Sequence, residues 1–142
     1  MALQVRSFLP DDEAAVIALW QRCGLTRPWN DPAKDIARKL TVQPELFAVV
    51  QAQPGGEIVG SVMAGFEGHR GWINYLAVDP GHQKQGLGRA LMDWAEQGLR
   101  AAGCPKINLQ IRAANAPVIA FYRAIGFAQD EVVSFGKRLE TD

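Results

Sequence analysis

The chain has 142 residues, 48% of them hydrophobic and 21% charged, and its 15 basic side chains balance 15 acidic ones. This composition predicts a globular protein with one domain over residues 1–142, and the balanced charge argues against a nucleic-acid or membrane partner. The sequence has no signal peptide and no apolar run near the roughly 18 residues of a membrane span, so we expect a cytoplasmic protein. Cys23 and Cys104 form no CxxC pair, which predicts free thiols and no metal site.

The first part of the chain predicts a strand followed by two helices. Residues 3–8 alternate as in a strand, and the acidic turn that begins at Pro10 is typical of a helix start. After a loop with two prolines, a short second helix is expected over residues 32–40. Its Ile36 and Leu40 are expected to face the core.

The middle of the chain predicts three strands and a long helix. The β-rich residues 46–51 and 57–66 flank a Pro-Gly-Gly turn, which favours an antiparallel hairpin. Residues 72–78 form the next strand. A single apolar stripe then predicts a helix over residues 86–102.

The last part of the chain predicts a strand over residues 106–111, a helix that starts at Asn115, and a final strand over residues 131–139. The strands on either side of the long helix are parallel, because a helical crossover joins them. The element order is β-α-α-β-β-β-α-β-α-β. The sequence therefore predicts an α/β fold of the α+β kind, with a mixed sheet and a central βαβ unit.

A glycine-bearing loop leads into the long helix. It consists of Gln83, Lys84, Gln85, Gly86, Leu87, Gly88 and Arg89. The two glycines let the backbone approach a ligand oxygen, and the N–H groups of residues 84–89 point along the positive end of the helix. Lys84, Arg89 and His82 add positive charge, so the loop predicts an anion site. An ordinary helix start with solvated cations is the alternative, and the residues fit neither a P-loop nor a dinucleotide fingerprint.

The loop matches the pattern Q/R-x-x-G-x-G/A, and it thereby resembles the acetyl-CoA pyrophosphate motif of the GNAT superfamily of N-acetyltransferases. Residues 76–80 (LAVDP) are similar to the lead-in of that motif, and residues 115–127 resemble the family's N…A…FY…GF helix. The segments RPWNDP, GFEGHRG, GCPKINLQI and GKRL further resemble the YpeA-like bacterial acetyltransferases. The resemblance covers nearly the whole chain. It implies a GNAT-like fold that transfers an acetyl group from acetyl-CoA to a primary amine.

The resemblance also implies where the cofactor binds. Backbone groups of Leu76, Ala77 and Val78 would pair with the pantetheine arm, and the strands flanking the long helix would splay apart to admit it. The N–H groups of residues 83–89 would hold the pyrophosphate. Asn115 would hydrogen-bond the pantetheine.

Tyr122 is implied both as a contact near the thioester sulfur and as the general acid, with a core tyrosine as the alternative. The Val78 N–H would be the oxyanion donor. Many family members carry a glutamate on the fourth strand as the base, but residues 72–75 offer none. Glu67 and His69 are the nearest titratable groups, and a plain polar turn is an equal alternative for both. The base matters because deprotonating a lysine amine at pH 7 costs roughly 4.6 kcal/mol, against about 1 kcal/mol for an α-amine.

The acceptor should be recognised by Arg27, Trp29 and Asn30 in the loop between the first two helices, although Trp29 is equally suited to packing against the prolines. Only 15 residues follow Phe127, enough for one further strand. Two arrangements stay open: an accessible pocket, or a pocket that a second copy completes as a homodimer. An open pocket would suit a peptide or protein amine, and a closed one would suit a small amine. A GNAT-like module that binds acyl-CoA without catalysis is the alternative function, and a longer acyl donor is a second one.

Overall fold

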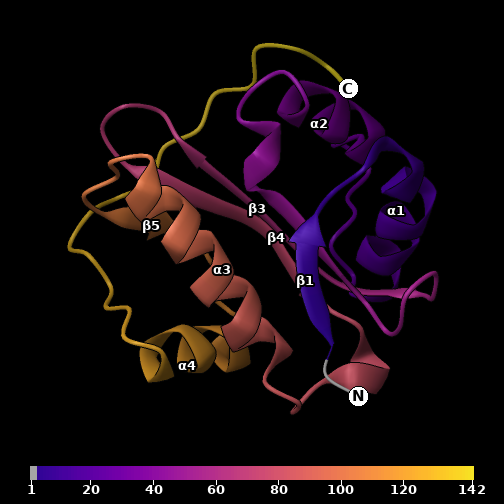
Figure 1. Cartoon of the computed structure of the whole chain (residues 1–142). Helices are drawn as coiled ribbons and strands as arrows, with labels where there is room; N and C mark the ends of the chain where they lie inside the picture. The colour runs from indigo at the N-terminus through magenta and orange to yellow at the C-terminus, as the bar shows by residue number, and fades with distance from the viewer. Residues whose placement is uncertain (1–2) are drawn as a thin grey trace.

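The computed structural model describes residues 3–142, and its centre is a five-stranded sheet in the order β1-β2-β3-β4-β5 (Figure 1). The strands are β1 (Gln4–Ser7), β2 (Phe47–Gln51), β3 (Ile58–Phe66), β4 (Gly71–Val78) and β5 (Ile107–Leu109). Neighbouring strands from β1 to β4 pair antiparallel, and β5 pairs parallel with β4. This confirms the predicted mixed sheet, the hairpin of β2 and β3, and the parallel strands on either side of the long helix.

The α-helices of residues 3–142 cover both faces of the sheet. They are α1 (Glu13–Arg22), α2 (Pro32–Lys39), α3 (Leu87–Ala101) and α4 (Ala116–Ala124), and short 3-10 turns occur at Pro10–Asp12, Pro44–Leu46 and Pro80–His82. Helices α1 and α2 lie on one face, while α3 crosses the other and has α4 beside its N-terminal end (Figure 1). Across these described residues, no helix has the length and apolar character that a membrane crossing requires.

The sheet separates two apolar cores. Along β2, Phe47 and Val49 belong to the core beneath α1 and α2, whereas Ala48 and Val50 belong to the core beneath α3. Successive side chains of a strand point to opposite faces, so a strand covered on both faces needs an unbroken apolar run. That requirement explains the sequence of β2.

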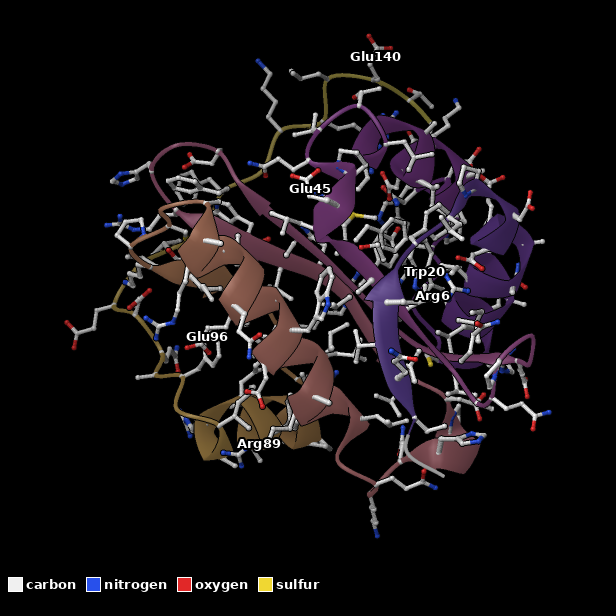
Figure 2. The ribbon with its side chains drawn as sticks, in the orientation of Figure 1. Arg6, Trp20, Glu45, Arg89, Glu96 and Glu140 are labelled. Carbon is white, nitrogen blue, oxygen red and sulfur yellow. The ribbon has the colours of Figure 1, made fainter. Side chains whose placement is uncertain are left out.

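A buried polar link ties α1 to the centre of the sheet. The Trp20 ring stacks on Tyr75 with centroids 3.7 Å apart, and its Nε1 donates a hydrogen bond to Ser61 Oγ at 2.9 Å (Figure 2). Ser61 Oγ in turn donates to the Tyr75 carbonyl oxygen at 2.8 Å. The backbone of β4 at Tyr75 is therefore held from the α1 side.

The predicted final strand is wrong: residues 131–139 form no strand. Four large apolar side chains there are 77–92% exposed, namely Val132, Val133, Phe135 and Leu139. A strand needs a backbone partner, and the adjacent β5 is only three residues long and shorter than the predicted 106–111. Within residues 3–142, the bonds between this part of the chain and the β5 region involve side chains alone, as where Asn108 Nδ2 donates to Asp130, just before the segment, at 2.9 Å.

The expected core position of Leu40 is also wrong. Helix α2 ends at Lys39, and Leu40 is its C-cap with 36% of its surface exposed, while Ile36 is fully buried as predicted. Lys39 is buried instead, and its Nζ donates to the Ala64 carbonyl oxygen at 2.5 Å. A helical turn places residues three apart on one face, so Lys39 follows Ile36 toward the sheet.

Candidate active site

The parallel strands β4 and β5 stay together over only three residue pairs. Gly71, Trp72 and Ile73 pair with residues 107–109, and β4 then continues to Val78. Within residues 3–142, no strand pairs with residues 74–78 on this side of β4. The two strands therefore part, as the resemblance implied, and leave a notch with an open backbone edge.

A β-bulge in β4 sets which backbone groups face this notch. Ser61 pairs with Ala77 and Met63 with Asn74, so two residues of β4 oppose one of β3, and Tyr75 has a φ of 52°. Beyond the bulge, Asp79 N donates to the Val59 carbonyl oxygen of β3 at 2.8 Å. Backbone groups alternate along a strand, so the N–H of Ala77 also faces β3.

The same alternation turns the N–H groups of Leu76 and Val78 toward the open edge. Ala77, which lies between them, is directed to β3 and is 4% exposed. Of the three residues expected to meet the pantetheine, the geometry therefore presents the backbone of two to the notch. Ala77 instead supports β4 from behind.

Asp79 organises the loop that follows β4. Its carboxylate accepts hydrogen bonds from Arg22 Nε at 2.7 Å and from Gly81 N at 3.0 Å, and it contacts His82 Nδ1 at 3.1 Å. The contacts with His82 and Arg22 lower the pKa of Asp79. His82 is thus bound to this carboxylate, which removes it from the expected set of free cations on the loop.

The glycine-bearing loop ends in a helix start that no side chain caps. Gly86 is the N-cap residue of α3 with a φ of 77°, its first turn has no acidic residue, and no atom lies within 4 Å of where a Cβ would stand. The first N–H groups of a helix lack intrahelical acceptors, so those of residues 87–89 are available to an anion. Arg89 lies in this first turn, at the α4 end of α3 (Figure 2).

Gly88 has a packing role that the sequence did not indicate. A Cβ at this position would lie 3.1 Å from Phe121 Cζ of α4 and 3.9 Å from Val78 Cγ2 of β4. The absent side chain therefore lets α3, α4 and β4 meet at one point. Leu87 beside it is a core residue, 7% exposed, so its backbone N–H is the part that faces the loop.

Helix α4 places Asn115 and Tyr122 on the other side of the notch. Asn115 caps α4, with its Oδ1 accepting from Val118 N at 3.4 Å, which leaves the side-chain N–H groups free to donate. The Tyr122 ring is buried between Phe121 and Phe127. Burial raises the pKa of Tyr122 to about 12. Among residues 3–142 its hydroxyl has no hydrogen-bond partner.

Glu67 and His69 lie in the turn before β4, at the end of the strand away from Val78. β4 is eight residues long, so its two ends are seven residue steps, or roughly 23 Å, apart. The Glu67 carboxylate accepts hydrogen bonds from the N–H groups of Arg70 and His69, and these bonds lower its pKa. A lower pKa makes Glu67 a weaker base. The structure therefore gives the Glu67 carboxylate a role in the turn and does not bring it to the loop end of the notch.

On the acceptor side, Asn30 belongs to a polar cluster that the sequence did not reveal. Its Nδ2 donates to the Tyr75 hydroxyl at 3.1 Å and to Asp35, and the Tyr75 hydroxyl donates to Asp35 at 2.6 Å. Burial and the Asp35 contact raise the pKa of Tyr75 well above its usual value. A tyrosine directly before Leu76 was the available signal, but its bulge and its partners 40 and 45 residues away come only from the tertiary structure.

The other expected acceptor residues have distinct environments. Arg27 Nη1 donates to the carbonyl oxygens of Gly24 and Thr26, so this guanidinium stabilises its own loop. Trp29 is 55% exposed, which argues against a packing role. It lines an open hollow of about 570 Å³ together with Arg38 and residues 136–140 and 142.

Comparison with known proteins agrees with this geometry. The pattern of the Acetyltransferase (GNAT) family matches residues 9–127. An acetyltransferase of Sodalis glossinidius is 48% identical over 141 residues, covering 99% of this chain and 98% of that protein. The crystal structure of the ribosomal-protein-S18-alanine N-acetyltransferase from Escherichia coli is similar with a TM-score of 0.72 and 29% identity, covering 91% of this chain and 79% of that one.

A further solved structure shares the fold at lower identity. The PaiA N-acetyltransferase of Thermoplasma acidophilum, in complex with coenzyme A, has a TM-score of 0.81 and 16% identity, with 94% of each chain covered. The family match and the full-length relative agree with the split sheet and the uncapped glycine loop. The chain belongs to the Acetyltransferase (GNAT) family, and it is an acetyltransferase.

Proposed function

We propose that this enzyme transfers an acetyl group from acetyl-CoA to the primary amine of a small molecule, peptide or protein. The observation that carries the proposal is the continuity of two binding features. The open edge of β4 at Leu76 and Val78 lies beside the uncapped N-terminus of α3, where the Cβ position of Gly88 is 3.9 Å from Val78 Cγ2. An extended amide chain that ends in a diphosphate matches both features at once.

In this proposal the pantetheine amides pair with the backbone of Leu76 and with the carbonyl oxygen of Val78, which leaves the Val78 N–H for the thioester. The Asn115 amide donates to the arm from α4. The pyrophosphate lies at the N–H groups of the loop. The contributing residues are Gln83, Lys84, Gln85, Gly86, Leu87, Gly88 and Arg89. A similar fold has been seen in complex with coenzyme A, which supports a coenzyme A thioester as the donor.

The chemistry is attack of a neutral amine on the thioester carbonyl, with loss of the thiolate. The Val78 N–H points into the notch, where it stabilises the oxyanion. Tyr122 is better suited to donate a hydrogen bond to the sulfur than to give up its proton. Its pKa is about 12, so full transfer to a thiolate whose thiol has a pKa near ~8.5 would cost about 5 kcal/mol.

Replacing Tyr122 with Phe should lower kcat by about 10- to 100-fold, because a hydrogen bond to a charged acceptor is worth about 1.5–3 kcal/mol. The Kd for acetyl-CoA should change less than threefold by the same reasoning, since the thiolate exists only after attack. The free energy of unfolding should change little, because the Tyr122 hydroxyl has no hydrogen-bond partner within the described residues. Steady-state thiol release and calorimetry separate the two effects, and unchanged kcat would remove Tyr122 from the mechanism.

The acceptor amine is proposed to have a low pKa of its own. Glu67 is a weakened base in an exposed turn, and His69 shares that turn. An α-amine with a pKa near ~7.8 is neutral at modest cost at pH 7, whereas a lysine amine is not. The similarity to an enzyme named for an alanine of a ribosomal protein is consistent with an α-amine on a peptide or protein.

The pH profile tests this assignment. Below the pKa of the acceptor amine, we expect kcat/KM to rise tenfold per pH unit, because the neutral form of the amine is the nucleophile. Above that pKa, kcat/KM should level off. An acceptor with a higher pKa should reach the plateau at a higher pH. A plateau that begins at the same pH with every acceptor, and that is lost in His69→Gln, would instead identify His69 as the base.

The direct test of the function is thiol release from acetyl-CoA with amines, amino acids, polyamines and peptides with free N-termini. Turnover with one of these classes supports the proposal and names the acceptor. Tight binding of acetyl-CoA without thiol release from any acceptor would favour the non-catalytic alternative. Faster release from a longer acyl-CoA would correct the donor.

A further inference from the structure

The segment 131–139 has the sequence of a strand but no strand partner. Its apolar side chains Val132, Val133, Phe135 and Leu139 are 77–92% exposed. In Figure 1 this last segment, in yellow, passes along the β5 side of the sheet before it reaches α2. Side-chain bonds join it to the β5 region, from Lys106 and Asn108 to Asp130 and from Gln110 to Ser134. Contiguous exposed apolar groups next to a sheet edge mark an interaction surface.

The segment is held extended at both ends. At its start, Asp130 accepts from Asn108 Nδ2 at 2.9 Å. At its end, the Asp142 carboxylate accepts from Arg38 Nη2 at 2.8 Å and from Asp31 N at 3.0 Å. These contacts lower the pKa of Asp142 to about 2, so the anchor is ionised at neutral pH. An extended segment fixed in this way loses little further freedom on pairing.

The residues between these anchors are complementary to themselves. When the segment is paired antiparallel with a second copy about Ser134, Val133 lies opposite Phe135 of the partner subunit. Glu131 then lies opposite Lys137 of the partner subunit, and Ser134 meets its own copy on the two-fold axis. Glu131 and Lys137 are exposed, and none of the ion pairs within residues 3–142 involves either one. Apolar and oppositely charged pairs are the cross-strand contacts that stabilise such a ladder.

We infer that two copies of this chain associate by antiparallel pairing of residues 131–137 about Ser134, and that the paired segment closes one side of the open hollow beside Trp29, which would then receive the acceptor. Residues 136–140 already line that hollow beside Trp29 and Arg38. In the pair, Lys137 lies next to Glu131 of the partner subunit, so each hollow has a wall to which both copies contribute. The statement about the acceptor rests on the proposed function, whereas the association itself does not.

Sedimentation and light scattering test the association without substrate. The wild type should have twice the 15.5 kDa chain mass. Glu131→Lys and Lys137→Glu should each weaken the dimer about 5- to 30-fold, because each creates two like-charge pairs across the axis. An equimolar mixture of the two variants should dimerise like the wild type, since every cross pair is then opposite in charge. The double variant should do the same.

A cross-linking experiment tests the register. Ser134→Cys should form a disulfide-linked dimer under mild oxidation, because the two copies meet at the axis. Glu140→Cys is the matched control and should form no such disulfide, since the two copies of residue 140 lie on opposite sides of the axis. The wild type measures any background cross-linking through Cys23 and Cys104. A monomeric wild type overturns the inference. A dimer whose affinity is unchanged by both charge reversals, and which forms no cross-link at position 134, also overturns it. The same holds if the segment pairs with another protein while this chain stays monomeric.

Discussion

Replacing Gly86 with Asp is expected to abolish measurable binding of acetyl-CoA. Gly86 caps α3 with a φ of 77°, and the space around its Cα is open. An aspartate there would place a carboxylate at the N–H groups that receive the pyrophosphate, and two anions at one helix start repel. Loss of a charge-assisted anion site should weaken binding by at least about 100-fold, which calorimetric titration measures directly.

Gly55 offers a matched control for this variant. It has a φ of 74° and also has nothing within 4 Å of a Cβ, but it lies in the turn between β2 and β3. Gly55→Asp therefore carries the same backbone strain, about 1–2 kcal/mol, without a ligand nearby. Both variants should lose similar stability, and only Gly86→Asp should lose the cofactor. Equal affinity in both would refute the anion site.

Replacing Val78 with Pro is expected to lower kcat by about 10²–10³-fold, because it removes the N–H proposed to stabilise the oxyanion. The fold should survive the change. Val78 N–H faces the open edge of β4, whereas Asp79 N bonds β3, so proline at 78 removes no bond of the ladder.

The neighbouring position provides the contrast. Ala77 faces β3, and Ala77→Pro should lose a ladder bond and several kcal/mol of stability. Thermal unfolding ranks the two variants, and thiol release with saturating acetyl-CoA measures the catalytic step. If Val78→Pro keeps full kcat, the oxyanion donor lies elsewhere. If it unfolds like Ala77→Pro, the assigned direction of the N–H groups is wrong.

The sequence predicted the elements whose stability is local. The apolar stripe of α3, the unbroken run of β2 and the glycine at position 86 each express a rule about neighbours a few residues apart. The final strand over residues 131–139 failed for the opposite reason, because local preference does not supply a backbone partner. The contacts that shape the site are also non-local. Tyr75 obtains its bulge from β3, and its hydroxyl contacts Asn30 and Asp35 from elsewhere in the chain.

Two of the predicted site residues have contacts that the sequence did not reveal. Gly88 was expected to admit a ligand, and the structure shows that it also admits Phe121. His82 was expected to supply charge, but Asp79 binds it. Neither contact could be read from the sequence, because each depends on where a distant helix or the turn geometry places a side chain.

The contact at Gly88 limits how large a side chain this part of the site can hold. Phe121 of α4 and Val78 of β4 both lie within 4 Å of the same vacant Cβ position on α3. A side chain added at position 88 would therefore press on Phe121 first, because protein interiors are close-packed and its ring lies 3.1 Å from that position. The spacing between α4 and the strand that carries the proposed oxyanion donor therefore depends on the size of one residue of α3.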